Sequence, residues 1–422
     1  MLQNPFYLFF TACLGLFFWA GYRRIFAEVP YRHSLWSFLG EECAPGQRRA
    51  IVRALLAGLP GDSGAMAWIL TMAALCLGGA GALFWYLVFS LLWLHPLGAL
   101  AGLWRYYQPG CGGRVELSAL LEGILCRKRA RARPGLGRLL RWLQTLALCG
   151  MLPLLFRILA SPSAPARGAE LLPWLVVLLA LWLLCRLVGE RGETVLSLLF
   201  LLLLAAALLG NLPNLIPAVK LVLLDAFDRS RFLFSLSGAG LAAALQAGGA
   251  AGCGGALLRT LSAREEGPSF AHPAQAAFYE ELRGLLQLTV QLALGLLFLC
   301  ARLVPEDNRW PQTCLWAFLC LFGLLWLGRA VRALARPEGR RCGLLCLGLV
   351  GAAAVWDIWK GTALLPGLSG GAAGLASLAL AGLLLFDSNW YFLLLEHYRD
   401  VHIWHVTPHP DLMQTEMERK NM

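Results

Sequence analysis

The sequence predicts an all-α polytopic membrane protein with about eleven transmembrane helices, two of which are discontinuous. Hydrophobic residues make up 58% of the 422 residues and charged residues only 14%, and the mean hydropathy is +0.63. A soluble core could not bury so much apolar surface. Apolar windows of about 20 residues, the length that crosses a hydrocarbon core of about 30 Å, recur along the whole chain.

In chain order, the windows that predict membrane spans fall at 5–22, 54–77, 81–105, 138–160, 171–188, 194–224, 236–258, 282–304, 313–335, 342–365 and 371–395. No convincing small-residue cleavage site follows the first window, so we expect it to be a retained helix. The window at 194–224 is long enough to tilt or to break, and four residues mark where: Asn211, Pro213, Asn214 and Pro217.

Basic residues gather in the loops after the first, third and ninth predicted spans, for example Arg48, Arg127 and Arg332. The even-numbered loops hold few of them. By the positive-inside rule the odd-numbered loops are cytoplasmic, so we expect a plasma-membrane protein with its N-terminus outside and its C-terminus in the cytoplasm. The net charge of +11 is then an orientation signal in the lipid bilayer, and it requires no nucleic-acid partner.

Two stretches interrupt otherwise apolar sequence. In the second span Pro60 removes a helix donor, and the glycines at 58, 61 and 64 permit unwinding. After the seventh span, the stretch Arg259–Ala277 (RTLSAREEGPSFAHPAQAA) carries charged residues that a lipid-facing helix would not tolerate. This second stretch either forms a cytoplasmic loop or ends a helix and lines a polar cavity, and its residue chemistry leaves both open.

The two interruptions lie five spans apart, which is typical of transporters built from inverted repeats. We therefore predict an extra N-terminal helix at 1–22, one five-helix repeat at 54–224, a second at 236–395 and a cytoplasmic tail at 396–422. The alternative is that glycine and proline are simply frequent in transmembrane helices.

Enzyme signatures are missing from the sequence. It contains no GxSxG, no HExxH and no phosphate-cradling glycine loop, so we expect neither an enzyme nor a cofactor. The 13 cysteines have no metal-ligand spacing, and the histidine-rich tail resembles a lipid-interface segment more than a metal site. His95, which precedes Pro96 in the third span, is either a proton relay or, as we favour, a neighbour of a helix kink bonded to a carbonyl.

Three segments in order resemble the alanine or glycine:cation symporter family. Residues 78–85, GGAGALFW, are similar to that family's GGPGAxFW. Asn211, with IPA at 216–218 and AF at 226–227, is similar to its N…IPA…AF, and the stretch 259–277 is similar to its RGLFSNEAGxGSAPIAHAAA. The resemblance implies the leucine-transporter-type fold and sodium-coupled transport of a small amino acid.

Several positions depart from the family pattern. Where the family has GTGN in its broken second helix, this chain has Gly61, Asp62, Ser63 and Gly64. Leu319 and Cys320 replace hydroxyl residues of the ninth helix. Because sodium needs several hard oxygen ligands, we expect the usual sodium site to be degraded.

The sequence thus predicts a secondary transporter of an alanine- or glycine-like amino acid by alternating access, either proton-coupled or uncoupled. The predicted substrate-binding residues are Gly61, Asp62, Ser63, Gly64, Arg264, Glu265, Gly267 and Ser269. The candidates for ion coupling are Asp62, Arg264, Glu265 and Cys320. The alternative is a transport-fold relic that serves as a membrane interaction or assembly subunit.

Overall fold

The computed structural model describes residues 5–26, 45–58, 62–107, 168–188, 192–227, 241–262, 270, 273–301, 313–322, 325 and 348. Within these residues all regular secondary structure is helical, which confirms the predicted class, an all-α polytopic membrane protein. The predicted spans at 138–160 and 371–395 and the tail at 396–422 lie outside the described residues, and so does the span at 342–365 apart from residue 348. The number of spans and the division into two repeats therefore stay predictions.

Among the described helices, three are long and apolar enough to cross a membrane: Pro5–Arg23, Ala82–Leu103 and Gln275–Cys300. Two helices joined by a bend, Thr194–Gly210 and Leu212–Phe227, form a fourth candidate span if they are counted as one. Shorter apolar helices accompany them at Trp68–Gly78, Leu172–Leu184, Leu241–Leu257 and Thr313–Phe322. The described part of the chain is thus a bundle of apolar helices suited to a bilayer.

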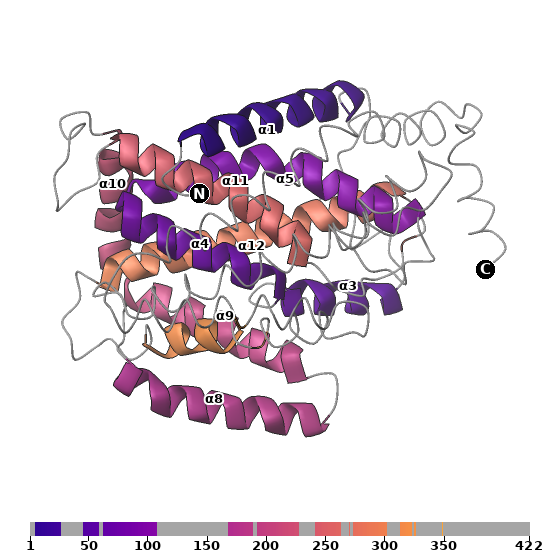
Figure 1. Ribbon diagram of the computed structural model, residues 1–422. Coiled ribbons are helices and arrows are strands. Elements are labelled where there is room, and N and C mark those ends of the chain that lie inside the picture. The colour runs from indigo at the N-terminus through magenta and orange to yellow at the C-terminus, as the bar shows by residue number, and fades with distance from the viewer. Residues whose placement is uncertain are drawn as a thin grey trace.

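Four helices form the centre of this bundle: α4 (Asp62–Gly78), α5 (Ala82–Tyr107), α11 (Leu241–Ser262) and α12 (Pro273–Ala301). Helix α5 packs along both α11 and α12, and α4 packs along α11 (Figure 1). Helix α1 (Pro5–Phe26) covers α5 and α11 on one side.

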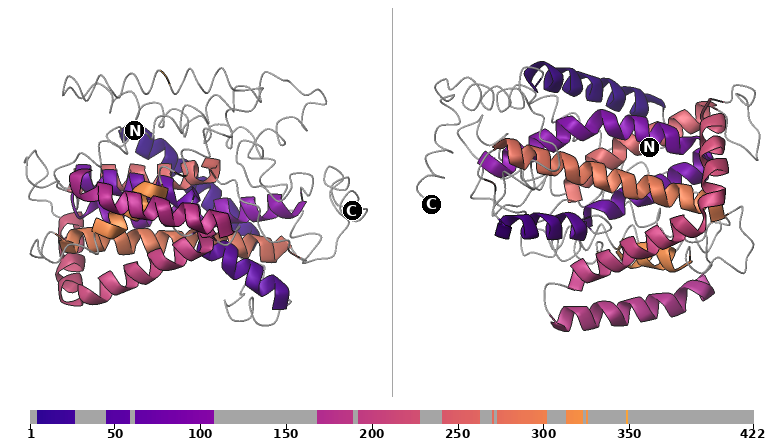
Figure 2. Two further views of the ribbon diagram at one scale, coloured as in Figure 1. Left: turned by 90° about the horizontal axis from the view of Figure 1, so that it is seen from below. Right: turned by 180° about the vertical axis from the view of Figure 1, so that it is seen from behind.

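Helices α8 (Gly168–Val188) and α9 (Gly192–Gly210) pack against each other and lie at the opposite edge from α1 (Figures 1 and 2). Many side chains of α8 that face away from the bundle are apolar and exposed, such as Leu172 and Leu184. In a bilayer such side chains contact lipid, so this edge fits a lipid-facing surface.

Small residues bring the central helices together. A Cβ added to Gly248 of α11 would overlap the carbonyl oxygen of Ala82 in α5. On the other side of α5, a Cβ on Gly102 would overlap the backbone of Ala277 in α12. Lipid provides no hydrophobic drive for helix association, so close packing at small residues is what stabilises such pairs.

The predicted break near Asn211 is confirmed. Helix α9 ends at Gly210 and α10 (Leu212–Phe227) starts two residues later, with an angle of 87° between them. The side-chain amide of Asn211 donates to the carbonyl oxygen of Ala207 at 2.7 Å, and the backbone N–H of Asn211 donates to the same oxygen at 3.2 Å, so two bonds hold the end of α9 at the bend. Helix α10 consequently runs across the ends of its neighbours (Figure 1, and the right-hand view of Figure 2).

Two predicted boundaries differ from the structure. The second span was expected at 54–77, but α3 (Pro45–Gly58) begins nine residues earlier, and α4 begins only at Asp62. The eighth span was expected from 282, but α12 begins at Pro273. Charged residues lie in the added turns of α12, and contacts within α12 and with other helices accommodate them inside the bundle.

Candidate functional site

The helices that flank the two interruptions of the sequence lie side by side. Helices α4 and α11 run antiparallel: a Cβ on Gly78, the last residue of α4, would lie 2.9 Å from Cβ of Ala247, near the start of α11. Further along, a Cβ on Gly255 would lie 3.7 Å from Cδ1 of Leu70. These two contacts fix the register between the helices.

Extending this register places the start of α4 beside the end of α11. Ser63 lies seven residues before Leu70, and Ser262 lies seven residues after Gly255. Seven residues are about two helical turns, so each serine shares the face of the residue that makes the contact. The N-terminus of α4 and the C-terminus of α11 therefore lie at the same level.

The outer flanks of the two interruptions also pack together. Ile51 and Leu55 of α3, which precede the first one, form a buried cluster with three residues at the C-terminal side of the second: Phe270 and Ala276, in its last part, and Tyr279, just after it. The rings of Phe270 and Tyr279 are 5.3 Å apart between centroids. The described flanks of both interruptions thus lie at one place in the bundle, not at separate ends.

The ends of the two helices have complementary polarity. The first turn of α4 presents backbone N–H groups without intrahelical partners, and the last turn of α11 presents carbonyl groups. The helix dipoles make the first end favourable for an anion and the second favourable for a cation. A zwitterion has one group suited to each end.

Three of the predicted substrate-binding residues fall at this place. Asp62, Ser63 and Gly64 form the start of α4. The others lie outside the described residues: Gly61, Arg264, Glu265, Gly267 and Ser269. Their roles in binding and coupling stay predictions.

Cys320, the remaining coupling candidate, lies in the helix Thr313–Phe322. It is buried in a hydrophobic cluster, as is its neighbour Leu319. In the same helix the indole of Trp316 packs edge-on against Trp68 of α4, with ring centroids 5.8 Å apart. The positions at which the resembled family has hydroxyl groups thus carry apolar and thiol side chains in an apolar environment.

Sequence reasoning missed a buried polar stripe on α12. Glu280, Arg283, Gln287 and Gln291 are all at most 9% exposed, and their spacing of three, four and four residues places them on one helical face. Glu280 and Arg283 form an ion pair at 3.5 Å. The hydroxyl of Tyr86 in α5 donates to the side-chain oxygen of Gln291 at 2.7 Å. Polar groups inside a membrane bundle are costly and mark a candidate pathway or binding site.

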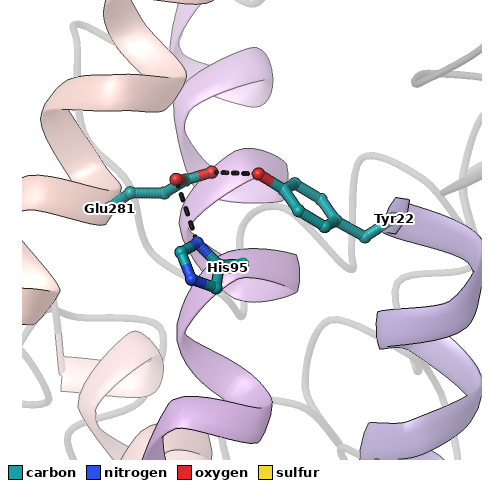
Figure 3. A network of polar contacts seen from close by, with 3 residues as sticks. All are labelled: Tyr22, His95 and Glu281. Atoms are coloured by element: carbon teal, nitrogen blue, oxygen red, sulfur yellow. Dashed lines mark hydrogen bonds and ion pairs between the residues drawn. The ribbon is translucent and has the colours of Figure 1, made fainter. Parts of the chain in front are cut away.

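A second polar cluster joins three helices. Glu281 of α12 accepts a hydrogen bond on Oε1 from the hydroxyl of Tyr22 in α1 at 3.0 Å, and its Oε2 lies 3.1 Å from Nδ1 of His95 in α5 (Figure 3). The rings of Tyr22 and His95 stack, with centroids 5.7 Å apart. His95 thus bonds a carboxylate, where we had favoured a carbonyl next to a helix kink.

Comparisons with known proteins do not identify a family. No family model matches the sequence, and a search of curated proteins finds no match. Among solved structures, the crystal structure of a mutant manganese transporter from Eremococcus coleocola aligns with 92% of this chain and 86% of that chain. The identity is 14% and the TM-score 0.39, and at these values the alignment carries no conclusion about fold or substrate. The resemblance to the alanine or glycine:cation symporters therefore stays a prediction, and what stands is a helical membrane protein in which the described flanks of the two interruptions meet.

Proposed function

We propose that this protein is a secondary transporter of a small amino acid, with its substrate site where the start of α4 meets the end of α11. The observation that carries the proposal is the antiparallel register of these helices, fixed by the contacts at Gly78 and Gly255. Discontinuous helices that meet inside a bundle expose backbone groups to a bound substrate, as in transporters that work by alternating access.

The substrate class follows from the polarity of this place. The amino acid's carboxylate suits the N–H groups around Ser63 and Gly64, and its ammonium group suits the carbonyls at the end of α11. Of the residues beyond the described ranges, Arg264, Glu265, Gly267 and Ser269 are proposed to complete the site. A small substrate such as alanine or glycine fits this proposal because helices in close contact leave little room.

Sodium is not part of the proposal. Leu319 and Cys320 lie among apolar side chains, where neither offers the hard oxygen ligands that sodium needs. A fixed cation, Arg264, or a proton on Asp62 or Glu265 would take its place. An interaction subunit that does not transport would also have lost its sodium ligands, so the test must separate the two functions.

The test has a binding part and a transport part. Purified protein is heated with each of a panel of amino acids, and a transporter gains thermal stability with one or a few of them because the ligand binds only the folded state. Counterflow in proteoliposomes with the best ligand then measures transport. If no amino acid changes the melting temperature and none exchanges, the protein is a structural subunit and the transport proposal is overturned.

A further inference from the structure

The cluster of Tyr22, His95 and Glu281 lies within the membrane-spanning part of the bundle, and the proposed substrate site does not use it. His95 is inside the span Ala82–Leu103, and Glu281 is inside the span Gln275–Cys300. The two residues are 186 positions apart in the chain and contact each other through Nδ1 and Oε2 at 3.1 Å. Ionisable residues at such depth carry a functional role more often than a structural one.

The surroundings of the two groups differ. The side chain of Glu281 is 12% exposed and that of His95 is 44% exposed, so the imidazole reaches the outside of the described bundle and the carboxylate does not. The backbone of α5 approaches the Glu281 side chain closely at Gly98, because a Cβ on Gly98 would lie 2.8 Å from Cγ of Glu281. Any larger residue at position 98 would displace Glu281 from His95.

We propose that His95 and Glu281 form a proton-binding site that couples transport to proton movement. In the empty state a neutral imidazole donates its Nδ1–H to the Glu281 carboxylate, and the pair carries a charge of −1. A proton from water then forms an N–H bond at Nε2, the ring nitrogen that faces away from Glu281, and the pair becomes neutral overall (Figure 3). Release breaks the same N–H bond and returns the proton to water.

A charged pair costs more in a dehydrated membrane bundle than a neutral one. Conformations that bury the pair from water therefore favour the proton-loaded form, and those that open it to water permit release. This difference is what couples a proton to a change between inward-facing and outward-facing states. The coupling rests on the proposed transport function, whereas proton binding by the pair does not.

Tyr22 supports the loaded form in two ways. Its hydroxyl donates to the second carboxylate oxygen at 3.0 Å, and its ring stacks on the imidazole, where the face of an aromatic ring attracts a cation. The nearby described charges are engaged elsewhere. The guanidinium of Arg23 lies over the ring of Trp19, and Glu280 pairs with Arg283 on another face of α12.

Proton binding is tested without any substrate. Histidine labelled at Cε1 is introduced into the purified protein, and the His95 signal is identified as the one lost in His95→Gln. At pH 7 we expect the imidazolium fraction of His95 to be severalfold lower in Glu281→Gln than in the wild-type protein, and to fall less in Tyr22→Phe. Asp225→Asn, a matched change of carboxylate to amide on α10, should leave it unchanged. If the fraction in Glu281→Gln equals that of the wild-type protein, the proton site is overturned.

Coupling is tested in proteoliposomes with the amino acid found by the thermal-shift screen. A gradient of two pH units can drive about 100-fold accumulation through one coupled proton. We expect Glu281→Gln to lose this accumulation and keep exchange at equal pH, while Asp225→Asn keeps both. If Glu281→Gln still accumulates substrate along the gradient, the coupling role is wrong and the transporter stands. If no amino acid is transported at all while His95 responds to Glu281→Gln, the transport function is wrong and the proton site stands.

Discussion

The carboxylate of Asp225 accepts a hydrogen bond from the backbone N–H of Gly81 at 2.8 Å. This bond joins the last turn of α10 to the turn between α4 and α5, 144 residues apart in the chain. Beside it, the indole N–H of Trp85 donates to the carbonyl oxygen of Ala226 at 3.1 Å, and Phe227 packs against the Trp85 ring. Two of the segments that carry the family resemblance, 78–85 and 216–227, therefore contact each other.

The first prediction concerns Gly81. A Cβ at this position would overlap the backbone of Ala226, so Gly81→Ala must push α10 away from the α4–α5 turn. We expect a loss of stability of about 1–3 kcal/mol, as in overpacked cores. The control is Gly210→Ala at the end of α9, where an added Cβ meets nothing within 4 Å. Thermal unfolding in detergent should show a lower melting temperature for the first variant only, and equal values would refute the tight contact.

The second prediction separates the charge of Asp225 from its hydrogen bond. Gly81 is buried, so Asp225→Ala leaves a buried N–H without its acceptor at a cost of about 1–3 kcal/mol. Asp225→Asn keeps an acceptor oxygen at the same position, so we expect a smaller loss. The melting temperatures should follow the order wild type, Asn, Ala. An Asn variant as unstable as the Ala variant would contradict this reading.

The third prediction tests the α5–α12 contact that holds His95 against Glu281. Gly102→Ala would overlap the backbone of Ala277 and separate the helices, again at about 1–3 kcal/mol. Gly255→Ala is the matched control, since it is also a buried helical glycine but the nearest atom to its added Cβ is 3.6 Å away. Only the first should lower the melting temperature. A loss of equal size in both would mean that glycine content, and not this contact, matters.

The fourth prediction concerns sodium. Because Leu319 and Cys320 lie in apolar surroundings, amino-acid uptake into proteoliposomes should be the same in sodium and in choline chloride at fixed pH. The thermal stability of the purified protein should be equally indifferent to sodium. Uptake that rises with sodium would show that an intact sodium site exists and that its absence was inferred wrongly.

The sequence carried enough local information for some elements. Asn211 and the prolines after it predicted a break, and the 87° bend between α9 and α10 lies there. The glycines around Pro60 predicted another, and regular helix ends at Gly58 and resumes at Asp62. Such breaks depend on backbone donors and conformational freedom, which residue types determine directly.

The start of α12 and the partner of His95 could not be predicted in this way. The eighth span was predicted only from 282, because the partners that accommodate Glu281 and Arg283, on α1, α5 and α12 itself, are set by packing and not by neighbouring sequence. One signal was present. Arg283, Gln287 and Gln291 recur every four residues, which places polar groups on one face of a helix.

The most direct test of the account asks whether the start of α4 lies beside the end of α11. A photo-crosslinking p-benzoylphenylalanine is placed at position 63, seven residues before Leu70, and the crosslinked peptides are identified by mass spectrometry. A second protein carries it at position 75, three residues before Gly78. The register predicts products at the end of α11, around Thr260–Ser262, from position 63, and in the first half of α11, around Ala250, from position 75. Products from position 63 at the start of α11, or none on α11 at all, would contradict the meeting of the two interruptions and the substrate site proposed there.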